Sequence, residues 1–179
     1  MNKIEFSKIV LTVLLVPFFY VSKAHASDSA GTRTSLAVAS SAVDMRALAL
    51  RNVLEKYDSP LAPYADSYIK SADKYGIEWE LLPAIAGLES SFGKHQLPSS
   101  YNSYGWGGGR LYFDSVDDGI ETVLSALKNK YMARGATTVE TIAPIYSESA
   151  TWAPRVRYFM NEIDREYARL GMHTLDLTI

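Results

Sequence analysis

The sequence predicts a mainly α-helical fold: a compact helical domain with little or no β-sheet over about residues 60–171. In several segments apolar residues recur at the three- and four-residue spacing of a helix face. Residues that begin or end helices flank most of these segments. With 47% apolar and 21% charged residues, the 179-residue chain can bury a core and form one domain. No stretch longer than Leu111–Phe113 has the character of a strand.

Residues 1–26 are predicted to be a secretory signal peptide. Lys3 and Lys8 give a positive start, an apolar run follows over residues 9–21, and Ala24-His25-Ala26 is a small-x-small cleavage site. The apolar run is shorter than the roughly 18 residues of a spanning helix. We therefore expect a secreted protein, periplasmic or extracellular, with no stable membrane insertion after cleavage. The alternative is an uncleaved membrane anchor.

Residues 27–59 are predicted to form a flexible tether followed by a possible helix. The stretch up to Val43 is dominated by Ser, Ala, Thr and Gly, which is typical of a flexible linker. From Asp44 to Tyr57 an apolar pattern follows an N-capping aspartate, which favours a helix. Pro60 and Pro63 then separate this helix from the predicted domain.

Two helices are predicted next, over residues 63–75 and 79–92. The first has Tyr64, Tyr68 and Ala72 on one face, and Gly76 ends it. The second is apolar over much of its surface, and Pro83 lies near its first turn, where a missing N–H is tolerated.

Three further helices complete the predicted domain. Ser115 forms a capping box with Asp118 and opens a helix through Tyr131, before Gly135. Thr138 caps a short helix through Ile145. Thr151 caps a long helix through Leu170, whose apolar residues share one face, and Gly171 is expected to close it and leave residues 172–179 as a C-terminal tail.

Composition and charge exclude several classes of function. The net charge of −2, without a clustered basic segment, gives no reason to expect nucleic acid as a partner. The absence of cysteine excludes disulfides, thiolate metal sites and a cysteine nucleophile. Three dispersed histidines lack the spacing of metal ligands. We expect no metal, no cofactor and a monomer.

One acidic residue is out of place in this pattern. On a helical wheel Glu89 falls between Ile85 and Leu82, in the middle of an apolar stripe. A carboxylate on a core face is costly unless it is paired or used. Burial and the negative end of the helix both favour the protonated form, which suits a general acid. The alternative is a structural glutamate held by Arg110 or Arg155.

The segment after this helix combines aromatic residues and glycines. Residues 94–113 contain five aromatic residues and four glycines, with Asn102, Ser99 and Ser100 among them. Aromatic faces pack against sugar rings, and glycines let the backbone approach a ligand closely. A long loop in a compact domain is usually functional. The alternative is a small secondary core beneath the loop.

These residues resemble motifs of the lysozyme-superfamily peptidoglycan hydrolases, and are closest to the glucosaminidase family. Residues 86–94, Ala-Gly-Leu-Glu-Ser-Ser-Phe-Gly-Lys, are similar to the catalytic-helix motif of that family. Residues 102–107 resemble its Asn-Leu-Phe-Gly block, and residues 113–120 its Phe-x-Ser block. Tyr146 matches a late tyrosine that lytic transglycosylases also have. The blocks occur in order across residues 76–163.

The resemblance implies a lysozyme-like domain that cleaves the β-1,4-linked amino-sugar backbone of peptidoglycan, with glycan strands as its partner. It implies that Glu89 is the general acid and that Tyr146 lines the site. The substrate-binding candidates are Ser90, Phe92, Asn102, Tyr104, Gly105, Trp106, Glu148 and Trp152.

The sequence departs from that family in one respect. Only residues 108–112 separate the glycine block from the Phe-x-Ser block, where glucosaminidases usually insert a β-rich lobe with a second carboxylate. Glu148 is the better substitute, and Asp114 and Asp117 are alternatives. Without a second carboxylate, the substrate's acetamido group or its 6-hydroxyl has to meet the cationic carbon, giving a hydrolase or a lytic transglycosylase. The alternative is a non-catalytic peptidoglycan-binding or envelope-assembly module.

Overall fold

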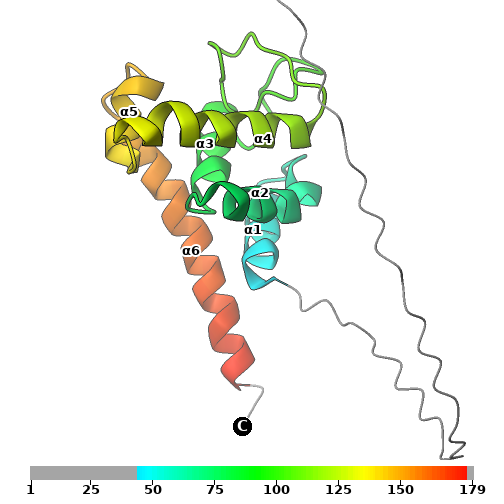
Figure 1. Ribbon diagram of the computed structural model, residues 1–179. Coiled ribbons are helices and arrows are strands. Elements are labelled where there is room, and N and C mark those ends of the chain that lie inside the picture. The colour runs from blue at the N-terminus through cyan, green and yellow to red at the C-terminus, as the bar shows by residue number, and fades with distance from the viewer. Residues whose placement is uncertain (1–43, 177–179) are drawn as a thin grey trace, which may run out of the picture. The chain divides into compact units, whose positions relative to one another are not determined.

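The computed structural model describes residues 44–176, and in this range the chain is mainly helical and has no strand, which confirms the predicted fold class. The signal peptide, the tether and residues 177–179 lie outside the described residues. Figure 1 shows the arrangement of the six α-helices in this range. They are α1 (Met45–Lys56), α2 (Ala65–Tyr75), α3 (Leu81–Ser90), α4 (Val116–Ala126), α5 (Val139–Tyr146) and α6 (Trp152–Asp176).

The sequence signals for helix ends are confirmed at most boundaries. Asp44 caps α1 by accepting a hydrogen bond from the Arg46 N–H, and Gly76 ends α2 with a φ of +60°. Thr138 and Thr141 form a reciprocal capping box at the start of α5. Ser115 caps α4, but the Asp118 carboxylate accepts from the N–H of Asp114 instead of Ser115, so the predicted capping box is only half formed.

The helix after α4 changes its winding before it ends. The segment Leu127–Tyr131 is a π-helix, and Met132–Arg134 is a 3₁₀ turn that Gly135 closes with a φ of +90°. The wider π turn places Tyr131 half-buried at the edge of the core. At this position Tyr131 lines a hollow in the surface.

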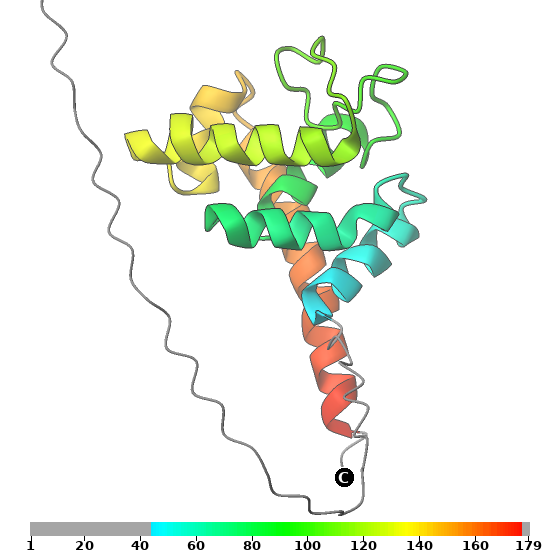
Figure 2. The same ribbon diagram turned by 45° about the vertical axis from the view of Figure 1, so that its right-hand side comes forward.

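The core forms around α3, which is buried on nearly all sides. Leu82 and Ile85 expose 1% and 0% of their surface. Helix α6 packs against α3 and α1, while α2 and α4 lie side by side (Figure 2). Because α3 is surrounded in this way, the apolar character of most of its surface follows from its central place.

The predicted domain boundary at residue 60 is wrong, because α1 belongs to the core. Leu50 and Leu54 are fully buried and join the same cluster as the leucines of α3. Helix α1 packs on α6, and Glu162 of α6 accepts hydrogen bonds from the Lys56 ammonium and the Tyr57 hydroxyl, both at 2.6 Å. The folded domain therefore includes α1.

The predicted end of the last helix at Gly171 is also wrong, because α6 continues to Asp176. A Cβ at Gly171 would meet no atom within 4 Å, and its φ is not positive. A glycine inside an exposed helix costs only about 1 kcal/mol of helix propensity and does not by itself end the helix. The predicted tail of residues 172–179 is therefore helical through Asp176. Within the described residues, no helix is both long and apolar enough to span a bilayer.

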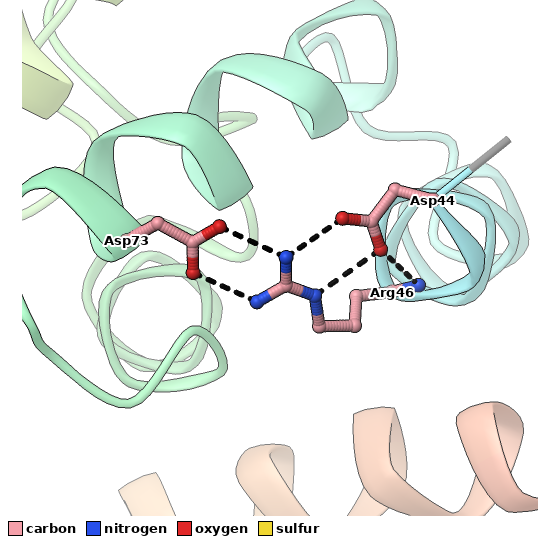
Figure 3. Close-up of polar contacts among 3 residues, drawn as sticks. All are labelled: Asp44, Arg46 and Asp73. Atoms are coloured by element: carbon pink, nitrogen blue, oxygen red, sulfur yellow. Dashed lines mark hydrogen bonds and ion pairs between the residues drawn. The ribbon is translucent and has the colours of Figure 1, made fainter. Parts of the chain in front are cut away.

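A charged bridge joins the first turn of α1 to the end of α2. Figure 3 shows the Arg46 guanidinium between two carboxylates, and it lies 2.7 Å from Asp44 and 2.8 Å from Asp73. The hydrogen bonds that Arg46 donates lower the pKa of both aspartates, and the aspartates in turn raise the pKa of Arg46. The bridge fixes the start of the domain on α2.

Replacing Arg46 with Gln is expected to lower the free energy of unfolding by about 1 kcal/mol at pH 7, because both ion pairs are partly exposed. The aspartates titrate below their ordinary value of 3.8, so this stabilisation is present above that pH and is lost as the pH falls through their lowered pKa values. Urea unfolding at pH 7 and pH 2.5 measures the effect. Arg51→Gln, which removes a single exposed pair with Asp66, is the control and should lose less.

A carboxyl pair between α3 and α6 has the opposite dependence on pH. Glu80, at the start of α3, is half-buried, and burial together with its hydrogen bond to Asp164 of α6 raises its pKa to about 7. The folded state therefore favours the protonated carboxyl. Its contribution is present below the ordinary value of 4.5 and is lost as the pH rises through 7.

We expect the wild type to lose about 1 kcal/mol of stability between pH 5 and pH 8 through this pair, after the shift is reduced for the exposure of Glu80. Glu80→Gln keeps a neutral hydrogen-bonding group and should flatten that part of the profile. The measurement is the free energy of unfolding in urea at half-unit pH intervals. A Glu80→Gln profile parallel to the wild type would contradict the assignment, and Glu55→Gln, at an exposed position of α1, is the control.

Candidate active site

Glu89 lies in the last turn of α3, where the chain leaves the helix abruptly. Ser91, Phe92 and Gly93 all have positive φ angles, of 51°, 57° and 84°. Serine and phenylalanine seldom adopt this region, and such strain gathers at functional sites. The helix therefore ends at Ser90, two residues before the predicted end, and the following loop turns back over the domain.

The expectation that Glu89 is buried is wrong, because its side chain is exposed. A helical wheel gives the direction of a side chain around the axis but not its depth along the axis. Ile85, one turn earlier, is fully buried, whereas Glu89 stands where α3 emerges from the core. The carboxylate thus faces a surface cleft at the end of a buried helix.

Two groups hold the Glu89 carboxylate in place. The indole Nε1 of Trp152, the first residue of α6, donates a hydrogen bond of 2.8 Å to Oε1. On the other side, a Cβ at Gly105 would come within 3.0 Å of Oε2, and Gly105 has a φ of +64°. Glycine is required here for both reasons. In the part of the chain that the structure describes, no arginine pairs with Glu89, which contradicts the arginine-held alternative.

Tyr146 supports Glu89 indirectly, because it packs on Trp152, the residue that donates a hydrogen bond to Glu89. Its ring stacks on the indole with centroids 4.9 Å apart and an interplanar angle of 29°. Its hydroxyl donates a 2.7 Å hydrogen bond to the carbonyl of Tyr104. Burial, followed by the negative charge of Glu89, raises the pKa of Tyr146, so the hydroxyl stays protonated. The direct partner of Glu89 is Trp152, which is 2% exposed and is therefore a support rather than the predicted substrate contact.

Asn102 and Ser90 hold the loop through hydrogen bonds to its backbone. The Asn102 amide donates to the carbonyls of Trp106 and Leu111 at 2.8 and 3.0 Å, and its oxygen accepts from the Trp106 N–H at 2.9 Å. The Ser90 hydroxyl donates to the Ser103 carbonyl at 2.7 Å and accepts from the Gly93 N–H at 2.8 Å. These polar atoms satisfy buried backbone. Both residues also line the hollow that contains Glu89, so their role as substrate contacts stays a prediction.

Phe92 and Tyr104 are also structural, because both are buried at 1% exposure or less. The Phe92 ring packs against Tyr57 and Phe159, with centroids 4.8 and 5.2 Å away. The Tyr104 hydroxyl is 2.8 Å from that of Tyr68, and burial raises the pKa of both. The structure thus places these two predicted contacts in the core, and neither residue lines the hollows beside Glu89.

Two hollows meet beside Glu89. One, of about 420 Å³, is lined by Glu89, Gln96 and Arg110 among others, and the other, of about 270 Å³, by Trp106, Tyr131 and Tyr146. Gly105 and Gly108 line both, so the hollows adjoin and form a groove that passes the carboxylate. We call them the carboxylate hollow and the aromatic hollow.

The structure brings several predicted contacts to the groove: Ser90 and Asn102 line the carboxylate hollow, and Trp106 and Tyr146 line the aromatic hollow. Trp106 is half-buried, and its ring centroid lies 5.7 Å from that of Tyr146 and 6.1 Å from that of Tyr131. Gly105 forms the shared wall. Tyr131 was missed because it ends an apolar helix face and therefore counts as core by its pattern. His95, Gln96 and Arg110 were missed because nothing in the sequence distinguishes them from ordinary loop residues.

The candidates for a second carboxylate do not reach the groove. Glu148, Asp114 and Asp117 are all exposed, and none of them lines either hollow. Within the described residues, Glu89 is the one carboxylate that lines the two hollows. No group of three or more potential metal ligands occurs in that part of the chain either.

The chain was compared with models of known protein families and with curated proteins, and neither comparison found a match. The resemblance to peptidoglycan hydrolases therefore rests on the motif residues of the sequence alone.

Asn102→Ala is expected to loosen the loop, because three hydrogen bonds to backbone groups are lost together. We expect a loss of about 1–3 kcal/mol in the free energy of unfolding and faster tryptic cleavage after Arg110 under native conditions. Limited proteolysis followed by mass spectrometry measures the cleavage. Asn129→Ala, at an exposed position on the other side of Trp106, is the matched control. Unchanged cleavage in Asn102→Ala would show that the amide does not hold the loop.

Proposed function

We propose that the protein is a secreted glycoside-cleaving enzyme that acts on the β-1,4-linked amino-sugar backbone of peptidoglycan, with Glu89 as its general acid. The observation that carries this proposal is one exposed carboxylate, oriented by a buried indole N–H, in a groove with an aromatic wall. Glycosidic bonds require a proton on the leaving oxygen, and a carboxyl group in a cleft is the usual donor.

The hydrogen bonding of Glu89 indicates which of its two oxygens transfers the proton. The hydrogen bond from Trp152 fixes Oε1, so Oε2, on the side of Gly105, is the atom that carries the proton to the leaving oxygen. Once that proton is transferred, the Glu89 carboxylate is the base for the second half of the reaction.

No second carboxylate of the described residues lines the groove, which favours assistance from the substrate itself. The 2-acetamido group can stabilise the cationic carbon and be displaced by water, which gives a hydrolase. Alternatively the 6-hydroxyl of the muramyl sugar attacks that carbon while Glu89 accepts its proton, which gives the anhydro end of a lytic transglycosylase. Both routes use Glu89 as acid and then as base.

Tyr146 acts in this scheme as a positioning residue. Its hydroxyl donates to the Tyr104 carbonyl and its ring supports Trp152, so it holds the indole that orients Glu89. Trp106 and Tyr131 provide the aromatic surface on which an amino-sugar ring stacks, since ring C–H groups pack against aromatic faces.

The test compares wild type, Glu89→Gln and Trp152→Phe on purified peptidoglycan sacculi, with soluble products identified by mass spectrometry. Glu89→Gln should reduce product release by about 10²-fold or more, because it removes the transferable proton. Trp152→Phe keeps the packing and loses the hydrogen bond, so a reduction of about tenfold is expected. Anhydro-muramyl ends identify a transglycosylase, and reducing ends a hydrolase.

Folding controls make the outcome decisive. Circular dichroism and thermal unfolding should show both variants folded, because Glu89 is exposed and Phe fills most of the volume of Trp152. A Glu89→Gln variant as active as the wild type would refute the proposed role. If no protein releases products and all pellet with sacculi, the chain is a peptidoglycan-binding module, the function that the missing second carboxylate favours next.

A further inference from the structure

The groove beside Glu89 has two chemically different halves. The aromatic hollow is lined by Gly105, Trp106, Gly107, Gly108, Tyr131 and Tyr146 and has no charged side chain. The carboxylate hollow contains two basic side chains, His95 and Arg110, in addition to Glu89. A ligand that crosses Gly105 therefore passes from an uncharged aromatic surface to one with basic groups.

Arg110 enters this hollow with its charge unneutralised. It is exposed, and in the part of the chain that the structure describes no carboxylate pairs with it. Four other described arginines are held by a carboxylate within 3 Å: Arg46, Arg51, Arg157 and Arg169. Of the described arginines without such a partner, Arg110 is the one that lines either hollow. A guanidinium group in a cleft without an acidic partner is a binding site for an incoming carboxylate, to which it donates two parallel hydrogen bonds.

The loop holds Arg110 at this place. Gly107, Gly108 and Gly109 turn the chain with positive φ angles just before it, and the carbonyl of Leu111 just after it accepts a hydrogen bond from Asn102. His95 is fixed from the other side, because its backbone N–H donates to the Ser90 carbonyl at the end of α3. Both basic residues are thus tied to the segments that carry Glu89 and Gly105.

We infer that Arg110, assisted by His95, determines substrate specificity by binding a carboxylate of the glycan strand, an inference that rests on the proposed function. The strand then lies with an uncharged amino sugar on Trp106 and Tyr131, and with the muramyl sugar, whose peptide supplies the carboxylates, in the carboxylate hollow. A neutral amino-sugar polymer offers no partner to Arg110. The preferred substrate is therefore an acidic strand, and its direction across Glu89 is set.

The test combines a substitution at Arg110 with a chemical modification of the substrate carboxylates. Wild type, Arg110→Gln and the control Arg134→Gln, an exposed arginine that lines neither hollow, are assayed on sacculi and on sacculi whose carboxylates are converted to methylamides. Arg110→Gln should lower kcat/KM about tenfold on untreated sacculi and leave it unchanged on the methylamides. Equal loss on both substrates, or none, would overturn the inference.

A binding measurement distinguishes a failure of this inference from a failure of the proposed function. In the Glu89→Gln background, the affinity for the two kinds of sacculi is measured by pelleting, with and without Arg110→Gln. A loss of about tenfold in affinity that depends on the carboxylates supports the role of Arg110 even if the chain cleaves nothing. An affinity that is independent of Arg110, in a wild type that releases products, refutes this inference and leaves the enzyme intact.

Two carboxylates of peptidoglycan share the chemistry that Arg110 recognises, and the substrate distinguishes them. In intact sacculi the lactyl group of a muramyl sugar is joined to the peptide as an amide, so an amidase removes the peptide carboxylates and frees a lactyl carboxylate. If the effect of Arg110→Gln persists on stripped strands, Arg110 also binds the lactyl carboxylate that the amidase has freed. If it disappears there but is present on intact sacculi, the ligand is a peptide carboxylate.

Discussion

The hydrogen bond from Trp152 to Glu89 is the interaction on which the arrangement of the site depends. A buried indole N–H without an acceptor costs about 1–3 kcal/mol, and Trp152, at 2% exposure, finds its acceptor in an exposed carboxylate. The bond therefore serves the core and the groove together. It also links the end of α3 to the start of α6, two helices that pack against each other over the centre of the domain.

The loop between α3 and α4 is held in place by its own polar side chains, which form hydrogen bonds with its backbone. Asn102 alone makes three hydrogen bonds to main-chain groups, and Ser90 ties the end of α3 to Ser103. In this way a segment without regular secondary structure satisfies its buried donors and acceptors. The same bonds bring Gly105 against Glu89 and place Trp106 beside Tyr146.

The sequence predicted helix ends correctly, because the signals for them are local. It did not predict how deeply a side chain is buried or which of several possible partners a polar side chain binds. Asp44, Gly76 and Thr138 mark helix ends through their own backbone chemistry, so those boundaries follow from the sequence. The exposure of Glu89 depends on how far α3 protrudes from the core, which periodicity does not encode. Asn102 is equally suited to a ligand and to the loop backbone, and its hydrogen bonds to Trp106 and Leu111 become apparent only in the folded loop. Arg110 and Tyr131 reach the groove through tertiary packing alone.

Helix α6 has a consequence for how the protein can be handled. Its first residue contacts Glu89, and the helix continues for 25 residues to Asp176. At 1.5 Å per residue its far end lies about 37 Å along the axis from the groove. A fluorescent reporter or a solid support attached at Asp176 would therefore stand well away from the groove. Immobilising the protein at this residue leaves the groove accessible to a large ligand.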